Sequence, residues 1–135
     1  MTIPPDLSHM AAGPAIAVLP LTCLSAHPDS AAFTRGLHEQ LQHQLVSMFG
    51  HVVLCPADGA PGIPRHASHA IEGSLRLEGR QTRVVARLLE SAAASIVWSR
   101  QFDFCEPRSS ALQELLAAEI CSGARQHVDG AGQLP

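Results

Sequence analysis

The sequence contains no lysine, so all nine of its basic residues are arginine, and charged residues make up only 16% of the chain. Its 12 acidic residues leave a net charge of -3. A surface that binds nucleic acid needs clustered positive charge, so this composition argues against direct binding of nucleic acid. The preference for arginine, alanine and glycine is typical of GC-rich coding DNA and indicates no particular function.

The sequence shows no pattern typical of a signal peptide or of a membrane-spanning segment. Residues 1–10 contain no Arg or Lys, whereas a signal peptide begins with a positively charged region. The apolar stretch over residues 11–24 is interrupted by Gly13, Pro14 and Pro20, and it is shorter than the ~20 residues that span a bilayer. We therefore expect a cytoplasmic protein with no membrane segment.

Cysteine is sparse, and its spacing does not match the common cysteine sites. None of the four cysteines, Cys23, Cys55, Cys105 and Cys121, stands in a C-x-x-C pair. Two disulfides in an oxidising compartment are one interpretation, and small buried hydrophobic residues are the other, which the burial preference of free cysteine favours. His66 and His69 supply too few ligands for structural zinc, so we expect no metal site.

Motifs for catalysis are missing as well. Ser74 follows Gly73, but the segment EGSLR lacks the Gly-x-Ser-x-Gly pattern of a nucleophile elbow. No glycine-rich phosphate loop precedes the first predicted helix. We therefore predict that the chain is not an enzyme.

What the sequence does contain is a clear pattern of secondary structure. Residues 1–13 are expected to be a flexible lead, and a strand over 15–21 is apolar on both faces, as in a sheet covered by crossover helices. Apolar residues then recur every four positions from Phe33 to Leu45, which predicts an amphipathic helix that ends at Gly50. A short apolar strand over 51–55 follows, and this order predicts a parallel crossover.

From His69 onward the apolar period changes to two. Two alternating runs meet at Gly79-Arg80, and a third run covers residues 96–104, so we predict an antiparallel meander. Trp98, Phe102 and Phe104 share one face of the third run and are expected to pack in the core. Ser109 and Ser110 predict the start of a second helix, because serine is a good N-cap.

Together these elements predict one domain over residues 14–128, followed by a frayed tail over 129–135. The fold class is α/β (α+β): a five-stranded mixed β-sheet with two amphipathic helices on one face, in the order β-α-β-β-β-β-α.

The same segments resemble the TolB amino-terminal-domain-like family, which occurs with winged-helix regulators, class III adenylate cyclases and tetratricopeptide proteins. The resemblance covers roughly residues 14–128, nearly the whole ordered chain. It rests on segments in the family's order: IAVLPL (16–21), FTRGLHEQL (33–41), IEGSLR (71–76), TRVVARLLES (82–91), VWSRQFD (97–103) and ALQELLAAEI (111–120). Arg35 departs from the family, which commonly has an acid there. The loop over 56–68 is also shorter and richer in proline than in the family, so contacts made through that region are not carried over.

Four residues are the candidates for a binding surface. Arg76, Arg83 and Arg87 fall on the polar face of the predicted meander, where they form either a basic patch for an acidic partner or phosphate ligand, or a solvated face paired with the nearby acids Glu72, Glu78 and Glu90. Glu72 is the fourth candidate, because Gly73 beside it allows another backbone to approach closely. Its alternative role is an outward side chain bonded to a neighbouring arginine.

The resemblance implies a non-catalytic module with no cofactor. We predict a protein-interaction or sensory and assembly module of a bacterial signalling or transcription-regulatory system, with an unidentified protein partner. Self-association through a sheet edge is a further expectation, because unpaired edges readily pair. The alternative is a small-ligand-binding domain with the ligand at the carboxyl ends of the first and second strands.

Overall fold

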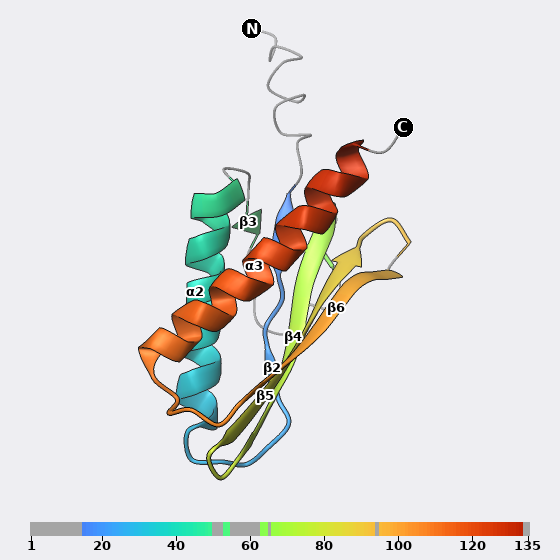
Figure 1. The fold of residues 1–135 in the computed structure, drawn as a ribbon. Helices are drawn as coiled ribbons and strands as arrows, with labels where there is room; N and C mark the ends of the chain where they lie inside the picture. The colour runs from blue at the N-terminus through green and yellow to red at the C-terminus, as the bar shows by residue number, and fades with distance from the viewer. Residues whose placement is uncertain (1–14, 50–52, 55–62, 65, 94, 134–135) are drawn as a thin grey trace, which may run out of the picture.

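The computed structural model describes residues 15–49, 53–54, 63–64, 66–93 and 95–133. The strands are β1 (Ile16–Val18), β2 (Thr22–Cys23), β3 (Val53–Leu54), β4 (His69–Glu78), β5 (Gln81–Glu90) and β6 (Ser95–Phe104), and the helices are α2 (Ser30–Phe49) and α3 (Ser110–Gln133). The strands form one mixed sheet in the order β3-β1-β4-β5-β6, with β2 also paired to β4, and both helices lie on one face of it (Figure 1). The predicted mixed sheet with two helices is confirmed, and β2 is the one added strand.

The first predicted strand is split in two. We expected a single strand over residues 15–21, but β1 ends at Val18 and the chain pairs again as β2, beyond the end of the predicted strand. Val18 lies opposite Ile71, and Thr22 lies opposite Ser74. The β1–β2 segment therefore advances four residues while β4 advances three. The extra residue is a bulge, and it forms here because the proline between β1 and β2 has no N–H to donate to a ladder.

β1 lies in the interior of the sheet. It pairs in parallel with β3 on one side and with β4 on the other, which confirms the predicted crossover through α2. Its three residues are all buried, as expected for a strand that is covered on both faces.

β4, β5 and β6 form the predicted antiparallel meander. The β4–β5 turn contains Gly79 with a φ of 57°, a left-handed conformation that glycine adopts without steric penalty. The β5–β6 ladder shifts register between Leu88 and Leu89, which lie opposite Trp98 and Ile96. Val97 is therefore an extra residue in β6, and it makes a second bulge.

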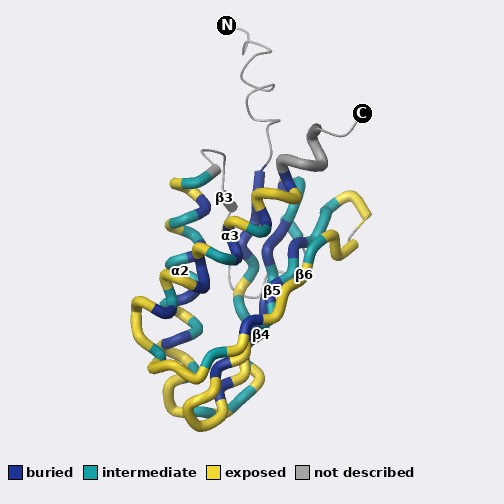
Figure 2. Tube along the Cα trace, in the orientation of Figure 1, coloured by how far each residue is buried: buried dark blue, intermediate teal, exposed yellow. Residues whose placement is uncertain are grey.

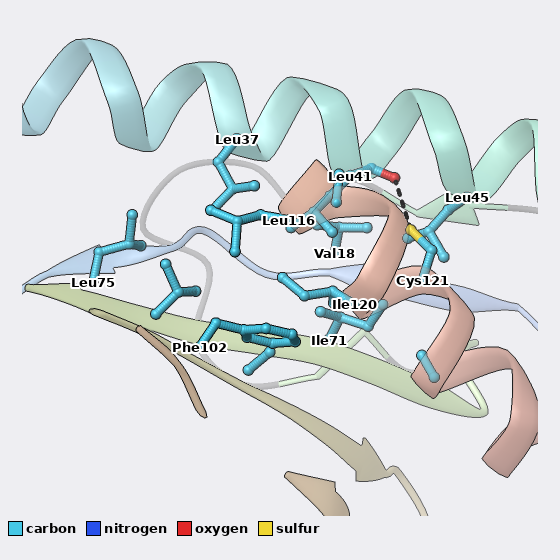
Figure 3. Packing of buried hydrophobic residues seen from close by; sticks show 14 of the residues in the cluster. Val18, Leu37, Leu41, Leu45, Ile71, Leu75, Phe102, Leu116, Ile120 and Cys121 are labelled. Carbon is cyan, nitrogen blue, oxygen red and sulfur yellow. Dashed lines mark hydrogen bonds between the residues drawn. The ribbon is translucent and has the colours of Figure 1, made fainter. Parts of the chain in front are cut away.

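The core lies between the helices and the sheet. In Figure 3, Leu37, Leu41 and Leu45 of α2 project towards apolar side chains of the sheet and of α3. The labelled partners on these elements are Val18, Ile71, Leu75, Phe102, Leu116, Ile120 and Cys121. Each buried leucine or isoleucine contributes about 1.5–3 kcal/mol of transfer free energy, so this layer is the main source of stability. From Ile71 onward, buried positions alternate with intermediate or exposed ones along β4, and β5 alternates in the same way as far as Leu89.

The second helix begins where its serines predicted, at Ser110. α2 begins at Ser30, and in the α3 cap the hydroxyl of Ser109 accepts a hydrogen bond from the Leu112 amide at 3.3 Å. α3 continues to Gln133, past residue 128 where we placed the end of the domain. Gly36 of α2 is closely packed, since the side chain of Gln113 occupies the place where a β-carbon would stand.

The aromatic residues of β6 pack as predicted. Phe102 is buried, and Trp98 and Phe104 are partly buried against the same core. The indole ring of Trp98 lies against α3 where a side chain on Gly123 would otherwise be, and its centroid is 6.2 Å from that of His127.

The second face of the sheet, opposite the helices, is only partly covered. At one end Ala67 packs with Ala17 and Ala70, and Ile63 and Leu89 contact this small cluster. Towards the β4–β5 turn the face carries polar side chains. None of the helices in the described part of the chain is long and apolar enough to cross a membrane.

Candidate functional site

The four predicted site residues lie together on the uncovered part of the sheet, which we call the open face. It is formed by alternate residues of three strands: Glu72, Ser74, Arg76 and Glu78 of β4, Arg83, Val85 and Arg87 of β5, and Ser99, Gln101 and Asp103 of β6. The structure thus brings the candidate residues onto one surface. Whether they bind a partner stays a prediction.

Glu72 and Arg87 form an ion pair across the β4–β5 ladder. They lie directly opposite each other, and Nη1 of Arg87 is 3.3 Å from Oε1 of Glu72. This is the neighbouring arginine that the second interpretation of Glu72 required. Gly73 beside it is closely approached by the Leu21 side chain and the Val85 carbonyl, so the tight packing expected at this glycine is also present.

Arg83 pairs with Asp103, a residue outside the four predicted candidates. Nε of Arg83 lies 2.7 Å from Oδ1 of Asp103, and Nε2 of Gln101 donates to Oδ2 at 2.9 Å. These hydrogen bonds hold the pKa of Asp103 below its usual value, and the aspartate raises the pKa of Arg83. The solvated-face interpretation named glutamates as partners, but the hydrogen-bonded partner of Arg83 is Asp103, because the β5–β6 register places it directly opposite, and Glu78 adds a weaker attraction.

Arg76 has no such partner. It lies directly opposite Arg83, an arrangement of like charges that is unfavourable in a sheet. Its side chain makes no hydrogen bond or ion pair with the residues that the structure describes. It therefore carries a positive charge that the described neighbours leave available to a ligand.

A hollow of about 400 Å³ lies beside Arg76 at this end of the sheet. Its lining combines both signs of charge with an aromatic ring and a thiol: Arg76, Glu78, Gln81, Thr82, Arg83, Asp103, Phe104 and Cys105. None of these residues belongs to β1 or β3, the two strands at whose carboxyl ends we placed the alternative ligand, so the hollow lies elsewhere in the fold.

Arg108 is a residue that sequence reasoning missed. Its side chain is 8% exposed and lies between the start of α3 and the β4–β5 turn. Nη2 donates to the carbonyls of Gly79 at 2.8 Å and Gln81 at 2.6 Å, and Nε donates to the buried hydroxyl of Thr82 at 2.8 Å. Nη1 also lies 3.4 Å from Oδ2 of Asp29 in the β2–α2 connection. Arg108 thus joins three segments that are distant in the chain, and its role is structural.

The cysteines occupy different environments. Cys121 is buried, and burial raises the pKa of its thiol to about 12. Burial also acts to raise the pKa of Cys23, but hydrogen bonds from Ser30 and Ser25 outweigh it and leave the pKa below its usual value. Cys105 is exposed at the hollow, so the interpretation as a buried hydrophobe is wrong there, because the chain leaves the sheet directly after Phe104. Each of these three thiols is free, and Cys55 lies outside the described residues.

The described residues contain no group of three or more side chains that could hold a metal ion. His66 is exposed, and Nδ1 of His69 lies 3.0 Å from the hydroxyl of Ser68. Burial lowers the pKa of His69. These two histidines therefore do not converge on a common ligand set within the described part of the chain.

Comparison with known proteins identifies the fold and not the family. No protein-family model and no curated protein matches the sequence. The PelC dodecamer from Paraburkholderia phytofirmans superposes with a TM-score of 0.64 at 17% identity, over 84% of this chain and 88% of PelC. Lipoprotein GNA1162 from Neisseria meningitidis gives a TM-score of 0.55 at 18% identity, over 90% and 99%.

TolB from Acinetobacter baumannii also matches, with a TM-score of 0.59 at 9% identity. The match covers 87% of this chain and 28% of TolB, so the likeness is to one part of that protein. At these identities the structures share their fold alone. The chain has a TolB-like fold, which it also shares with PelC and with a bacterial lipoprotein.

Proposed function

We propose that this chain is a non-catalytic binding and assembly module of a bacterial signalling or regulatory system. The assembly role is supported by the shared fold, since the PelC structures of this fold are dodecamers. The signalling context is supported by the resemblance of its segments to the TolB amino-terminal-domain-like family. We also propose a cytoplasmic location. This proposal needs a direct test, because one protein of similar fold is a lipoprotein. Fractionation of cells that express the tagged full-length protein provides that test.

One observation carries the binding role: the open face holds an arginine whose charge is not matched by the described residues. Arg87 is neutralised by Glu72 and Arg83 by Asp103, but Arg76 faces Arg83 and a hollow. An acidic group on a protein partner fits this position, because it would pair with Arg76 and relieve its repulsion with Arg83. We propose that the partner contributes a carboxylate here.

The test compares the proteins captured by the immobilised wild-type chain with those captured by the immobilised Arg76→Gln variant. Arg35→Gln is the matched control, since Arg35 is also an exposed arginine but lies on α2. We expect a protein that wild type and Arg35→Gln retain, that Arg76→Gln loses, and that elutes with added salt because exposed charges are screened. Retention of the same proteins by Arg76→Gln would show that the open face is not the binding surface.

A small anionic ligand is the second candidate, and the hollow favours it. Its volume of about 400 Å³ lies within the range of small-molecule sites. Inorganic phosphate is the simplest probe for Arg76 and Arg83, which lie opposite each other beside the hollow. A phosphate-dependent rise in melting temperature in wild type that is absent from Arg76→Gln would support this candidate, and an equal rise in both proteins would exclude it.

A further inference from the structure

β6 presents a long free edge at one side of the sheet. It is the last strand in the sheet order, and within the described residues its outer side pairs with no strand. It has ten residues, most of them exposed, and forms the largely yellow margin of the sheet in Figure 2. Such an edge has unpaired backbone groups that can pair with another strand.

The hydrogen bonds of β4 show which of its residues face each neighbour. The amide of Leu77 donates to the hydroxyl of Ser25 at 2.8 Å, and the carbonyl of Leu75 accepts from the amide of Leu24 at 2.8 Å. Odd-numbered residues of β4 therefore direct their backbone groups towards β2. Since these directions alternate along a strand, its even-numbered residues face β5.

The same alternation extends through β5 to β6. Glu78 lies opposite Gln81, so odd-numbered residues of β5 face β4 and even-numbered residues face β6. Arg100 and Phe102 lie opposite even-numbered residues of β5 and bond back to it. The remaining residues of the regular part of β6, Ser99, Gln101 and Asp103, direct their N–H and C=O groups outward.

We propose that this edge pairs with β6 of a second copy of the chain, antiparallel and centred on Gln101. The inference rests on the assembly part of the proposed function and names its partner and surface. Gln101 would face its own equivalent, and Ser99 would face Asp103 of the second copy. Every outward-facing residue then exchanges backbone hydrogen bonds with another.

Charge selects this register over its neighbours. Centring the pair on Arg100 or on Asp103 would set two identical charges opposite each other, which is unfavourable. A pair centred on Ser99 would set the bulged Val97 opposite Gln101 of the second copy. A pair centred on Phe102 would set Ser99 opposite Cys105, which lies beyond the end of β6. In the proposed register Asp103 faces a serine hydroxyl, and Arg100 faces Phe102, the ring over which it already lies at 4.7 Å within one chain.

The side chains of the two copies also match by face. Residues of equal parity face each other, so the polar open faces join on one side and the helices lie on the other. The bulge at Val97 ends the regular edge, because it twists the strand away from a straight partner. The pairing is therefore confined to the segment centred on Gln101.

The first test is the oligomeric state of the full chain by sedimentation velocity over a wide concentration range. We expect wild type to dimerise, or to form larger assemblies that contain this dimer. Gln101→Pro removes only an outward N–H and should leave a folded monomer, as judged by circular dichroism. Gln101→Ala keeps the N–H and should stay associated. If Gln101→Pro does not fold, Gln101→Lys serves instead, because it keeps the N–H but sets two like charges opposite each other.

The second test probes the register with two substitutions of Ser99. Ser99→Lys should lower the dissociation constant and Ser99→Asp should raise it, each by about tenfold, because each change faces Asp103 of the second copy twice in a symmetric pair. Within one chain Ser99 lies opposite Arg87, so the same changes should affect the monomer's melting temperature in the opposite direction. Folding effects and pairing effects are thereby separated.

The outcomes distinguish this inference from the proposed function. A wild-type chain that stays monomeric, or an assembly that survives both Gln101→Pro and Ser99→Asp, would overturn pairing through β6. The binding role of the open face would still stand in either case, since it is tested by Arg76→Gln.

Discussion

Two of the contacts that hold α3 and the segment before it to the meander use different chemistry. At the β4–β5 turn, Arg108 donates to two backbone carbonyls and to Thr82. Further along, the ring of Trp98 lies in the space left by Gly123. The first contact depends on matching each donor with an acceptor, and the second on the fit of a ring against a helix. The two sites should therefore respond differently to conservative substitution.

The largest effect is expected at the aromatic attachment. Trp98→Ala should lower the free energy of unfolding by about 3 kcal/mol, because a large ring leaves a space that the helix cannot fill. Urea unfolding followed by circular dichroism measures this, since Trp98 is the single tryptophan and fluorescence would be lost with it. An unchanged midpoint relative to Ser99→Ala, an exposed neighbour, would contradict the packing role.

Arg108→Ala should follow, with a loss of about 2–3 kcal/mol, because charged hydrogen bonds at a buried site are removed together. Arg108→Lys should not restore this stability, since an ammonium group cannot reproduce the planar fork of donors. Arg80→Ala is the control, an exposed arginine in the same turn. If Arg108→Lys had the same melting temperature as wild type, the positive charge of Arg108 and not the geometry of its donors would stabilise the contact with the β4–β5 turn.

Gly123→Ala tests the fit at the aromatic attachment directly. We expect a loss of about 2 kcal/mol, because the added methyl group meets the Trp98 ring. In a Trp98→Ala background the same change should become neutral or stabilising, since alanine favours helix over glycine by about 1 kcal/mol. A double-mutant cycle gives the coupling, and additive effects would exclude contact between the two residues.

Thr82→Val should have the smallest effect, about 1 kcal/mol, because one acceptor of Arg108 is lost while the shape is kept. Its effect should shrink in the Arg108→Ala background, where the hydroxyl has already lost its donor. Equal effects in both backgrounds, measured by urea unfolding, would show that the Arg108–Thr82 hydrogen bond adds nothing to stability.

Periodicity predicted the elements whose own residues determine them. The four-residue repeat of α2 and the alternation of β4 and β5 follow from which side chains face the core, so their positions were correct. The core role of Trp98 was predicted for the same reason. β2 could not be predicted, because Thr22 and Cys23 form a strand only where β4 lies beside them.

The site was predicted in part. The candidate residues do share one face, because alternation assigns faces along each strand. The partner of Arg83 was missed, since it depends on the register of β6, which a bulge shifts. Arg108 carried no signal, because its acceptors are mostly carbonyls, which every residue has, and only the fold brings the β4–β5 turn to it.

The interior position of β1 makes its pairing with β4 a contact between distant parts of the chain. Ile16 pairs with His69, 53 residues further along the chain, whereas β4, β5 and β6 pair with their immediate neighbours in sequence. Contacts between distant segments require closure of a long loop and form late. During synthesis β1 leaves the ribosome long before its partner β4 exists. The most deeply buried strand of the protein is therefore the one that chaperones have the longest opportunity to bind.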